Sequence, residues 1–556
     1  MNSIIIKELC NIKSITLHKV NRQAIGELDI NLLDNLSKDI SDTDTLEFSV
    51  PKCINNTIGK EKIEYPLYKE IKEERHICIN DNEFYTIKKI TENKKKNLKK
   101  VVAYSSEIKL AKNDIEVEDI GFYLVGKDEE KNIYSLDEYM YEQVGWRFGY
   151  IDDKVKYSIQ EDGTKEEKLR WQESVKTNWH DYILKNISES FECVPVFNTK
   201  EKLIDLYDID GFGNEVKLAL TYDGYLKDLE KNTSSEELVT RLKLYGNSEL
   251  TILDASPTGY KYVENYSYFM NEDEMSIELI NALNKYYEMV EKRTEEWKEL
   301  RKFKKDKMVI LNAKENENAF VIGNMNSLES QIKTYKAEND VVNEAKKKEE
   351  WKKEKDKFVI LKNEIDELEE EVNLIQDNID QINILCKRET CTDDSGGLIF
   401  DSNLLDELKE FVFYDTYTND AILNSDDLIK IGKRQLDLNC KPTREWNVDS
   451  VNFMERLIDT GFRSHFNGVL GLGDIIALVD EDGNEELVYF VGFNRDFKTK
   501  KLNLILSDKK LKTDNKRVIG DLLFAAKKTV KEINNNKYLW MNQKYDRINL
   551  DVEKGK

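Results

Sequence analysis

The chain has 556 residues, of which 40% are hydrophobic and 10% aromatic, so it can bury several cores and is not a disordered polymer. Its formal net charge is −23 and its isoelectric point is near 5.0, which argues against a general nucleic-acid binder because such proteins present basic surfaces. The seven cysteines include no Cys-x-x-Cys pair, and this pattern predicts reduced thiols in a cytoplasmically made protein rather than disulfides or a zinc ribbon.

The N-terminal residues lack the basic and then apolar segments of a signal peptide. No uncharged apolar run reaches about 18 residues, the length that a membrane-spanning helix needs. We therefore expect neither secretion by a signal peptide nor a membrane span.

Residues 1–114 are predicted to form a small β-barrel of five or six short strands. Residues 12–20 and 45–51 alternate between apolar and polar side chains, as half-buried strands do. Residues 75–79 and 84–91 are predicted to pair as a hairpin across a turn at 80–83, and residues 94–97 form a second turn.

Residues 115–236 are predicted to form a separate α+β lobe. A helix is expected over 171–191, where apolar residues recur at helical spacing. Strands are expected at 193–197, 203–207 and 218–221, the last of them followed by a turn at Asp223 and Gly224.

The segment 237–255 is predicted to supply the first strands of a second β-barrel. Leu238, Thr240, Leu242 and Leu244 alternate with residues of the opposite face, and a turn containing Pro257, Thr258 and Gly259 follows. The next residues become helical, and comparable strands resume only near residue 470. A sheet is therefore expected to open at Thr240 and to be completed by residues 461–510, about 230 residues later.

Residues 276–388 are predicted to form a helical coiled-coil insertion. No proline occurs between residues 276 and 386, and apolar residues follow each other at alternating spacings of three and four, which is a heptad pattern. The repeating residues are Phe358, Leu361, Ile365, Leu368, Val372, Ile375, Ile379, Ile382 and Cys386. Residues 312–326 contain Gly323 and several asparagines, so we expect the bend of an antiparallel arm there. The apolar face could instead contact a neighbouring subunit.

Residues 256–275 and 389–460 are predicted to form a second α+β lobe. Helices are expected over 404–412 and 425–438, with Asp426 capping the second, and an extended segment over 442–454. Residues 470–479, 487–493 and 501–506 are expected to form a three-stranded meander. A C-terminal helix near 519–533 and a charged tail are expected within 511–556.

The chain lacks the residue patterns of familiar catalytic and ligand sites. His18, His76, His180 and His465 form no His-Glu-x-x-His motif, and no Gly-x-Ser-x-Gly elbow occurs. Residues 208–211 (DIDG) resemble a calcium loop, but Leu206 and Lys217 occupy its first and last ligand positions, so a turn is expected.

Two further sets of residues lack the pattern of a binding site. Gly468, Gly471 and Gly473 miss the dinucleotide-binding spacing and precede a strand rather than a helix. Cys386 and Cys391 are expected to be a core thiol and a loop thiol. The sequence thus predicts no catalytic residue, no cofactor and no metal site.

Several short segments occur in a characteristic order between about residue 45 and residue 508. They are 46–51 (LEFSVP), 191–207, 238–242 (LVTRL) with Gly246, 257–260 (PTGY) with 264–265, 417–420 (YTND), 428–438 with Pro442, and 472–474 (LGD). In this order they resemble the hub or tail-associated proteins of long-tailed bacteriophages, a family that includes prophage tail endopeptidase-like and minor structural proteins.

The resemblance implies an α+β multidomain protein whose two small β-barrels alternate around a homotrimer, so that three copies form a pseudo-sixfold ring. It implies a structural baseplate or tail-tip hub that closes or extends the tail tube, in a virion assembled in the host cytoplasm. The implied partners are the distal tail protein, the tape measure protein and receptor-binding or fibre proteins. DNA would pass through without specific binding, since an acidic bore repels phosphates.

Other functions stay open at this stage. A tail-associated peptidoglycan hydrolase is the main alternative, although the lytic domain that some family members carry toward the C-terminus is expected to be absent. The arm is expected to be a spacer or a trimer clamp, with receptor binding as the other reading.

Overall fold

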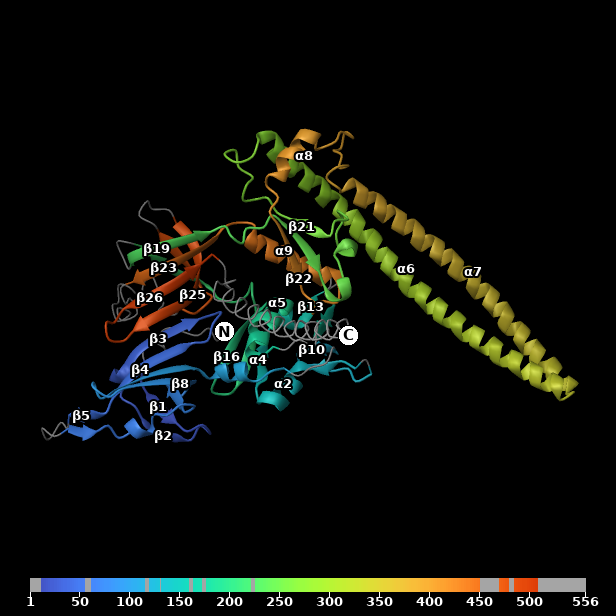
Figure 1. Cartoon of the computed structure of the whole chain (residues 1–556). Helices are drawn as coiled ribbons and strands as arrows, with labels where there is room; N and C mark the ends of the chain where they lie inside the picture. The colour runs from blue at the N-terminus through green and yellow to red at the C-terminus, as the bar shows by residue number, and fades with distance from the viewer. Residues whose placement is uncertain are drawn as a thin grey trace, which may run out of the picture.

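The computed structural model describes residues 12–55, 62–115, 120–130, 132–159, 164–172, 177–221, 226–450, 470–479 and 485–508. They form a mixed α+β body from which a long helical hairpin projects (Figure 1). The predicted α+β class and the long helical arm are confirmed. No helix of the described residues is long and apolar enough to cross a membrane.

A 13-stranded sheet collects strands from both ends of the chain. Its N-terminal strands are β1 (Ile15–His18), β2 (Ala24–Glu27), β3 (Leu33–Asp39), β4 (Thr45–Pro51), β7 (His76–Ile79), β8 (Glu83–Asn93) and β9 (Leu98–Ser105). Its later strands are β18 (Glu215–Leu220), β19 (Leu226–Ser234), β23 (Thr443–Ser450), β24 (Ile475–Val479), β25 (Glu485–Asp496) and β26 (Leu502–Ser507).

Strand β25 joins the two halves of this sheet. Its first part pairs with β24, its second part pairs with β3, and β26 runs along both parts, all antiparallel. Phe48 from the N-terminal half and Phe490 and Leu504 from the later half belong to one buried core. Among the described residues β19 and β2 pair on one side only, so the strands form a continuous sheet rather than the two closed barrels that the sequence predicts.

The predicted local turns of the N-terminal half are confirmed. Strands β7 and β8 form the expected hairpin, and Asn80 and Asp81 in its turn have positive φ angles of 50° and 53°. Asn97, in the turn between β8 and β9, has a φ of 49°. Asn and Asp adopt this left-handed conformation more readily than other non-glycine residues, which is why they mark the turns in the sequence.

The lobe that follows the first strands contains three small sheets and short helices. Its strands are β10 (Ile120–Tyr123), β11 (Tyr134–Ser135), β12 (Arg147–Ile151), β13 (Tyr157–Ile159), β14 (Lys165–Glu167), β15 (Arg170–Gln172), β16 (Cys193–Asn198) and β17 (Leu203–Asp208). Its helices are α2 (Leu136–Val144), α3 (Asp153–Lys156), α4 (Trp179–Asp181), a π-helical turn at Tyr182–Ile187 and α5 (Ser188–Phe191). The strands expected at 193–197, 203–207 and 218–221 are confirmed.

The helix expected over 171–191 is shorter than predicted. Residues 170–172 form β15 and pair with β10, and the Trp171 backbone N–H donates to the Ala421 carbonyl at 2.9 Å. The helical segment starts at Trp179, where Asn178 accepts a hydrogen bond from the Asp181 backbone N–H at 2.9 Å. A strand partner and an N-cap therefore override the helical spacing of the apolar residues.

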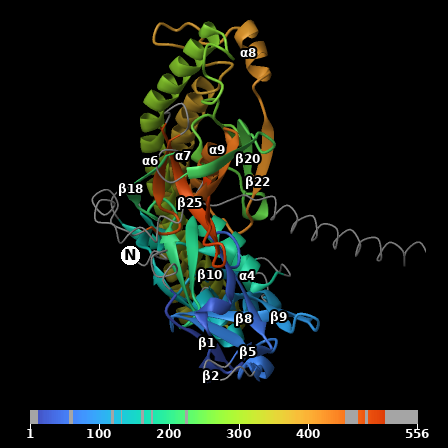
Figure 2. The same ribbon diagram turned by 90° about the vertical axis from the view of Figure 1, so that its left-hand side faces the viewer.

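The strand at Thr240 belongs to a different sheet from the one predicted. Strand β20 (Arg241–Tyr245) lies between the antiparallel β21 (Tyr262–Glu264) and the parallel β22 (Tyr414–Thr418). Figure 2 shows β20 and β22 beside α9. The assignment of 237–255 to the sheet of 461–510 is wrong, because the closing strands pair instead with β18 and β19, which end just before residue 237.

The arm consists of two antiparallel helices, α6 (Ile277–Ala337) and α7 (Val341–Leu385). α6 has 61 residues and reaches roughly 90 Å at 1.5 Å per residue. The predicted heptad face of α7 is confirmed as the face against α6: Leu361, Ile365, Val372, Ile375, Ile379 and Ile382 are buried. Figure 1 shows the arm extending away from the sheets.

The predicted bend of the arm at 312–326 is wrong. α6 continues through this segment, and its Leu311 and Val321 are buried. The helices reverse direction at residues 338–340, where Asn339 has a φ of 59° and Asp340 caps α7 by accepting from the Asn343 backbone N–H at 3.1 Å. The burial of apolar residues along α6 outweighs the cost of a single helical glycine, about 1 kcal/mol.

Two predicted helices after the arm are confirmed as α8 (Ser402–Lys409) and α9 (Ser425–Asn439). The cap of α9 is Asn424, which accepts from the Asp427 backbone N–H at 2.7 Å, so the assignment of Asp426 as the cap is wrong. Asp426 instead pairs with Arg301 of the arm. The remaining short elements are β5 (Cys53–Asn55), β6 (Lys62–Glu64) and 3₁₀ turns at Ile30–Leu32, Tyr68–Glu70, Ser106–Lys112, Asn247–Glu249 and Leu253–Ala255.

The meander expected over 470–506 is confirmed as β24, β25 and β26. The extended segment expected from residue 442 is confirmed as β23 up to residue 450. The C-terminal helix expected near 519–533 lies outside the described residues.

Candidate functional site

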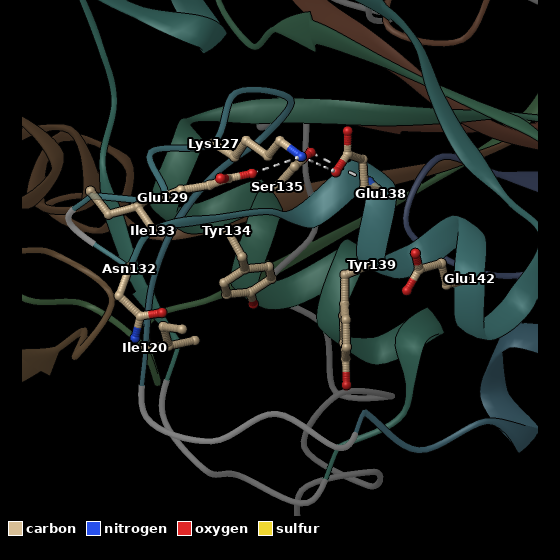
Figure 3. A pocket seen from close by; sticks show the side chains of 10 residues that line it. All are labelled: Ile120, Lys127, Glu129, Asn132, Ile133, Tyr134, Ser135, Glu138, Tyr139 and Glu142. Atoms are coloured by element: carbon tan, nitrogen blue, oxygen red, sulfur yellow. Dashed lines mark hydrogen bonds and ion pairs between the residues drawn. The ribbon is translucent and has the colours of Figure 1, made fainter.

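An open depression of about 500 Å³ lies where β10, β11 and α2 meet (Figure 3). Its lining residues are Ile120, Lys127, Glu129, Asn132, Ile133, Tyr134, Ser135, Glu138, Tyr139 and Glu142. The Lys127 Nζ lies 3.5 Å from a Glu129 carboxylate oxygen and 3.6 Å from a Glu138 carboxylate oxygen. These two carboxylates, Glu138 first, raise the pKa of Lys127.

The floor of the depression is aromatic. The rings of Tyr134 and Tyr139 meet edge to face with centroids 5.6 Å apart. The Tyr134 hydroxyl oxygen is buried without a hydrogen-bond partner in the described structure, and burial raises the pKa of this phenol. Ser135 caps α2: its hydroxyl donates to the Val125 carbonyl at 2.8 Å and accepts from the Glu138 backbone N–H at 3.3 Å.

This arrangement can hydrogen-bond a small polar molecule, because carboxylates, an amide and a phenol face the depression. It does not resemble a nucleophilic site, since the Ser135 hydroxyl is already engaged by the backbone, and the ten lining residues include no histidine to act as its base and no cysteine to act as a nucleophile. The spacing of residues in the sequence did not predict this depression, because its walls come from three separate elements.

His18 and His76 lie opposite each other on the paired strands β1 and β7, and both contact the Phe84 ring, whereas His180 lies on α4. His18 contacts Thr16 at 2.8 Å and the Arg22 carbonyl at 2.9 Å. His76 is buried beside Thr86, and burial followed by the positive charge of Lys109 lowers its pKa to about 4. His180 contacts Thr43 at 3.2 Å and stacks on a phenylalanine ring. His465 lies outside the described residues, and the described residues contain no His/Cys/Asp/Glu cluster suited to a metal ion.

The remaining residues considered as sites in the sequence analysis lie in turns, before a strand or in a core. The Asp208 carboxylate accepts from the Gly211 backbone N–H at 3.1 Å, which confirms the expected turn. Gly473 has a φ of 89° and precedes β24, as expected. Cys386 ends α7 and Cys391 lies in the following loop, and both thiols are buried. Gly468 lies outside the described residues.

A buried charged cluster lies where β3 pairs with β25. The Lys38 Nζ is 2.7 Å from Glu83 and 3.1 Å from Asp44, and the Lys38 side chain is only 2% exposed. Burial raises the pKa of Asp44 to about 6 and that of Glu107, aided by the Asp44 charge, to about 8. The Tyr85 hydroxyl donates to Glu83 at 3.0 Å. The cluster therefore contains three carboxyl groups for one cation.

A second buried cluster links the root of the arm to the β20–β22 sheet. Glu264 binds Arg388, and its other carboxylate oxygen lies 3.3 Å from an Arg241 guanidinium nitrogen. The Tyr266 hydroxyl accepts from Arg241 at 2.9 Å and donates to Glu264 at 3.2 Å. Despite burial, Glu264 holds the pKa of Arg388 above its usual value. Neither charged cluster was predicted from the sequence, because ordinary surface charges consist of the same residue types.

No family model matches the chain. Among curated proteins, the chain is 25% identical over 396 residues to YomG, an SPbeta prophage-derived uncharacterized protein of Bacillus subtilis (strain 168). The match covers 66% of this chain and 43% of the relative, so it spans less than half the length of that protein.

Solved structures of tail proteins also align with the chain. The prophage tail protein gp18 of Listeria monocytogenes EGD-e aligns over 93% of this chain and 100% of its own, with 10% identity and a TM-score of 0.42. The prophage MuSo2 43 kDa tail protein of Shewanella oneidensis aligns over 90% and 99%, with 7% identity and a TM-score of 0.41. The chain is thus similar in sequence to a prophage-derived protein, in agreement with the resemblance to phage proteins stated from its motifs.

Proposed function

We propose that this chain is a structural protein of a bacteriophage or prophage tail, which acts as a hub at the tail tip. The observation that carries the proposal is the sequence similarity to a prophage-derived protein over two thirds of the chain. The construction of the molecule supports it, because strands from before and after a 61- and 45-residue helical hairpin share one sheet and one core. Such a body offers a rigid base for a projecting arm.

We also propose that the chain acts as a homotrimer that closes or extends the tail tube and docks to the distal tail protein. Support comes from the two ends of the large sheet, β19 and β2, which pair on one side only among the described residues. Unpaired edges are usually covered in natural proteins, and an assembly of copies covers them. The tape measure protein and receptor-binding or fibre proteins are further proposed partners, and DNA passes without specific binding.

Sedimentation of the purified full chain, alone and with the distal tail protein of the same phage or prophage, tests the trimer. The proposal predicts a species of three times 65.2 kDa and a larger complex with the distal tail protein. A mass of 65.2 kDa at every concentration, with no binding of the distal tail protein, would contradict it.

The alternative, a peptidoglycan hydrolase, is tested by zymography on host cell walls. A structural role predicts no clearing by this chain alone. Clearing that is lost when carboxylates of the depression, such as Glu138 or Glu142, are replaced by glutamine would favour the hydrolase.

A further inference from the structure

Ion pairs between the two helices mark one face of the arm. The Lys307 Nζ of α6 lies 2.5 Å from the Glu371 carboxylate of α7, and the Lys314 Nζ lies 2.8 Å from Glu364. Residues one helical turn apart share a face of a helix. The side chains one turn from these four residues therefore lie on the same face of the arm as the ion pairs.

Large apolar side chains lie exposed on this face. Phe303 and Ile310 precede the two paired lysines by one turn, and they are 51% and 47% exposed. On α7, Ile360 precedes Glu364 by one turn, and Leu374 follows Glu371 by three residues. These two side chains are 58% and 64% exposed. We call these four residues the arm stripe.

The arm stripe is large enough to contribute to an interface between proteins. Exposed phenylalanine, leucine and isoleucine side chains of this kind supply roughly 100 Å² each, or about 400 Å² together. A standard interface buries about 800 Å² on each partner. The stripe therefore supplies about half of the area that a specific contact requires.

The two helices carry opposite charges at the level of the stripe. Residues 301–314 of α6 contain six basic residues and one acidic residue, whereas residues 363–377 of α7 contain seven acidic residues and no basic one. The ion pairs Lys307–Glu371 and Lys314–Glu364 place these two segments side by side. The arm thus has a basic flank on α6 and an acidic flank on α7.

Several of these charged side chains form no ion pair within the described part of the chain. Lys302 and Lys305 on α6, and Glu367 and Glu370 on α7, are exposed, and we find no ion pair for them among the described residues. Each flank repels a copy of itself and attracts the other flank. A contact between unlike flanks of two identical chains is heterologous, and such contacts close into a ring when the rotation between copies allows it.

We propose that the arms of separate copies of this chain pack side by side, with the basic flank of α6 in one copy against the acidic flank of α7 in the next. The arm stripe faces the axis that the copies share. Burial of the stripe supplies hydrophobic free energy, and the flanks fix the parallel orientation and the order of the copies. This packing involves the arms alone and does not depend on the position of the chain in a tail.

Isotope-coded crosslinking of the full chain tests this packing. Copies labelled with ¹⁴N and ¹⁵N are mixed at a concentration where chains exchange, concentrated, and treated with a carbodiimide that joins lysines to carboxylates in direct contact. The proposal predicts crosslinks between 301–314 and 363–377 that combine both isotopes. Crosslinks that join only residues of the same isotope, or the absence of crosslinks between these segments, would overturn it.

Charge-reversed variants distinguish attraction between the two flanks from non-specific association of the arms. Replacing Glu367 and Glu370 with lysine, or Lys302 and Lys305 with glutamate, is expected to lower the yield of mixed-isotope crosslinks between other residues of the two segments at least tenfold. A chain that carries all four changes is expected to regain them, because the flanks attract again. The control, Lys352→Glu with Lys353→Glu nearer the arm tip, is expected to leave the yield unchanged.

Circular dichroism of each variant verifies that the helices are retained. Crosslinks that survive either reversal, or that the fourfold change does not restore in a helical chain, would contradict the proposal. So would an arm that crosslinks in assembled particles only to a different tail protein.

Discussion

At the scale of single residues, the buried cluster around Lys38 has more acidic than basic groups. Lys38 balances one carboxylate, but Asp44, Glu83 and Glu107 share its surroundings. Burial of a charge without a partner is costly, so the carboxyl groups of Glu107 and Asp44 retain their protons to higher pH than in an unfolded chain. The cluster therefore couples the stability of the β3–β25 junction to pH.

We predict that the chain loses stability as the pH rises from 5 to 9. The folded-state pKa values of Asp44 and Glu107, about 6 and about 8, lie above their unfolded values, so their contribution is present at low pH and is lost as the pH passes through those values. Urea unfolding at a series of pH values measures this. Glu107→Gln is expected to flatten the decrease between about pH 6 and 8, where Glu107 alone still loses its proton. The exposed control Glu296→Gln is expected to leave the decrease unchanged. An equal pH dependence of all three proteins would contradict the assignment.

The cluster at the root of the arm has the opposite imbalance, with two guanidinium groups on one carboxylate. We predict that Glu264→Gln destabilises the chain by about 3–5 kcal/mol, because it leaves the buried Arg388 and the half-buried Arg241 without their anion. Urea unfolding of this variant beside the exposed control Glu272→Gln measures the difference. A loss no greater than that of the control would show that the arginines are not held by Glu264.

Residue chemistry could be predicted from the sequence where the effect is local. The turn at Asn80 and Asp81 and the turn at Asp208 depend on neighbours along the chain, and both were predicted. Lys38 and Glu107 are 69 residues apart, and only the folded sheet brings them together. The depression beside Tyr134 was missed for the same reason.

At the scale of elements, periodicity predicted the arm but not its turn. The heptad face of α7 is the buried face, since helical spacing fixes which side chains share a stripe. The asparagine-rich segment near Gly323 suggested a bend, but Leu311 just before this segment and Val321 within it are buried, and α6 is continuous. The actual turn has only one residue with a left-handed conformation, Asn339.

We predict that Gly323→Ala stabilises the arm by roughly 1 kcal/mol, because alanine favours a helix interior and no atom lies within 4 Å of the added Cβ. Hydrogen exchange of α6 amides measures the change. Gly396→Ala serves as the contrasting variant, since its φ of 83° disfavours alanine and a loss is expected. A loss of protection in Gly323→Ala would indicate a bend at this position.

Sheet pairing was predicted less well than strand position. Most of the expected strands exist, yet β20 pairs with β21 and β22, and the split sheet is formed by β18 and β19. Alternation of apolar residues shows that a segment is a half-buried strand, but it does not show which neighbour it pairs with. Strands β19 and β20 lie less than 30 residues apart and alternate in a similar way, so the sequence did not show which of them pairs with the strands after the arm.

At the scale of the whole molecule, the chain is a body with one large sheet, two smaller lobes and a hairpin that projects from them (Figure 1). The general idea of a sheet interrupted by the arm holds, because strands before and after the arm share one core. The ring of copies and its position in a tail are properties of an assembly, which a single chain does not contain. They remain proposals.

The most direct test of the tail proposal is to locate the chain on purified particles of the phage or prophage that encodes it, with an antibody raised against the arm, residues 276–388. A tail-tip hub is expected to be labelled at the tip of the tail, and this labelling is expected to be lost when the arm is deleted from the encoded chain. Particles that are infectious or fully assembled without this chain, or labelling confined to the head, would contradict it.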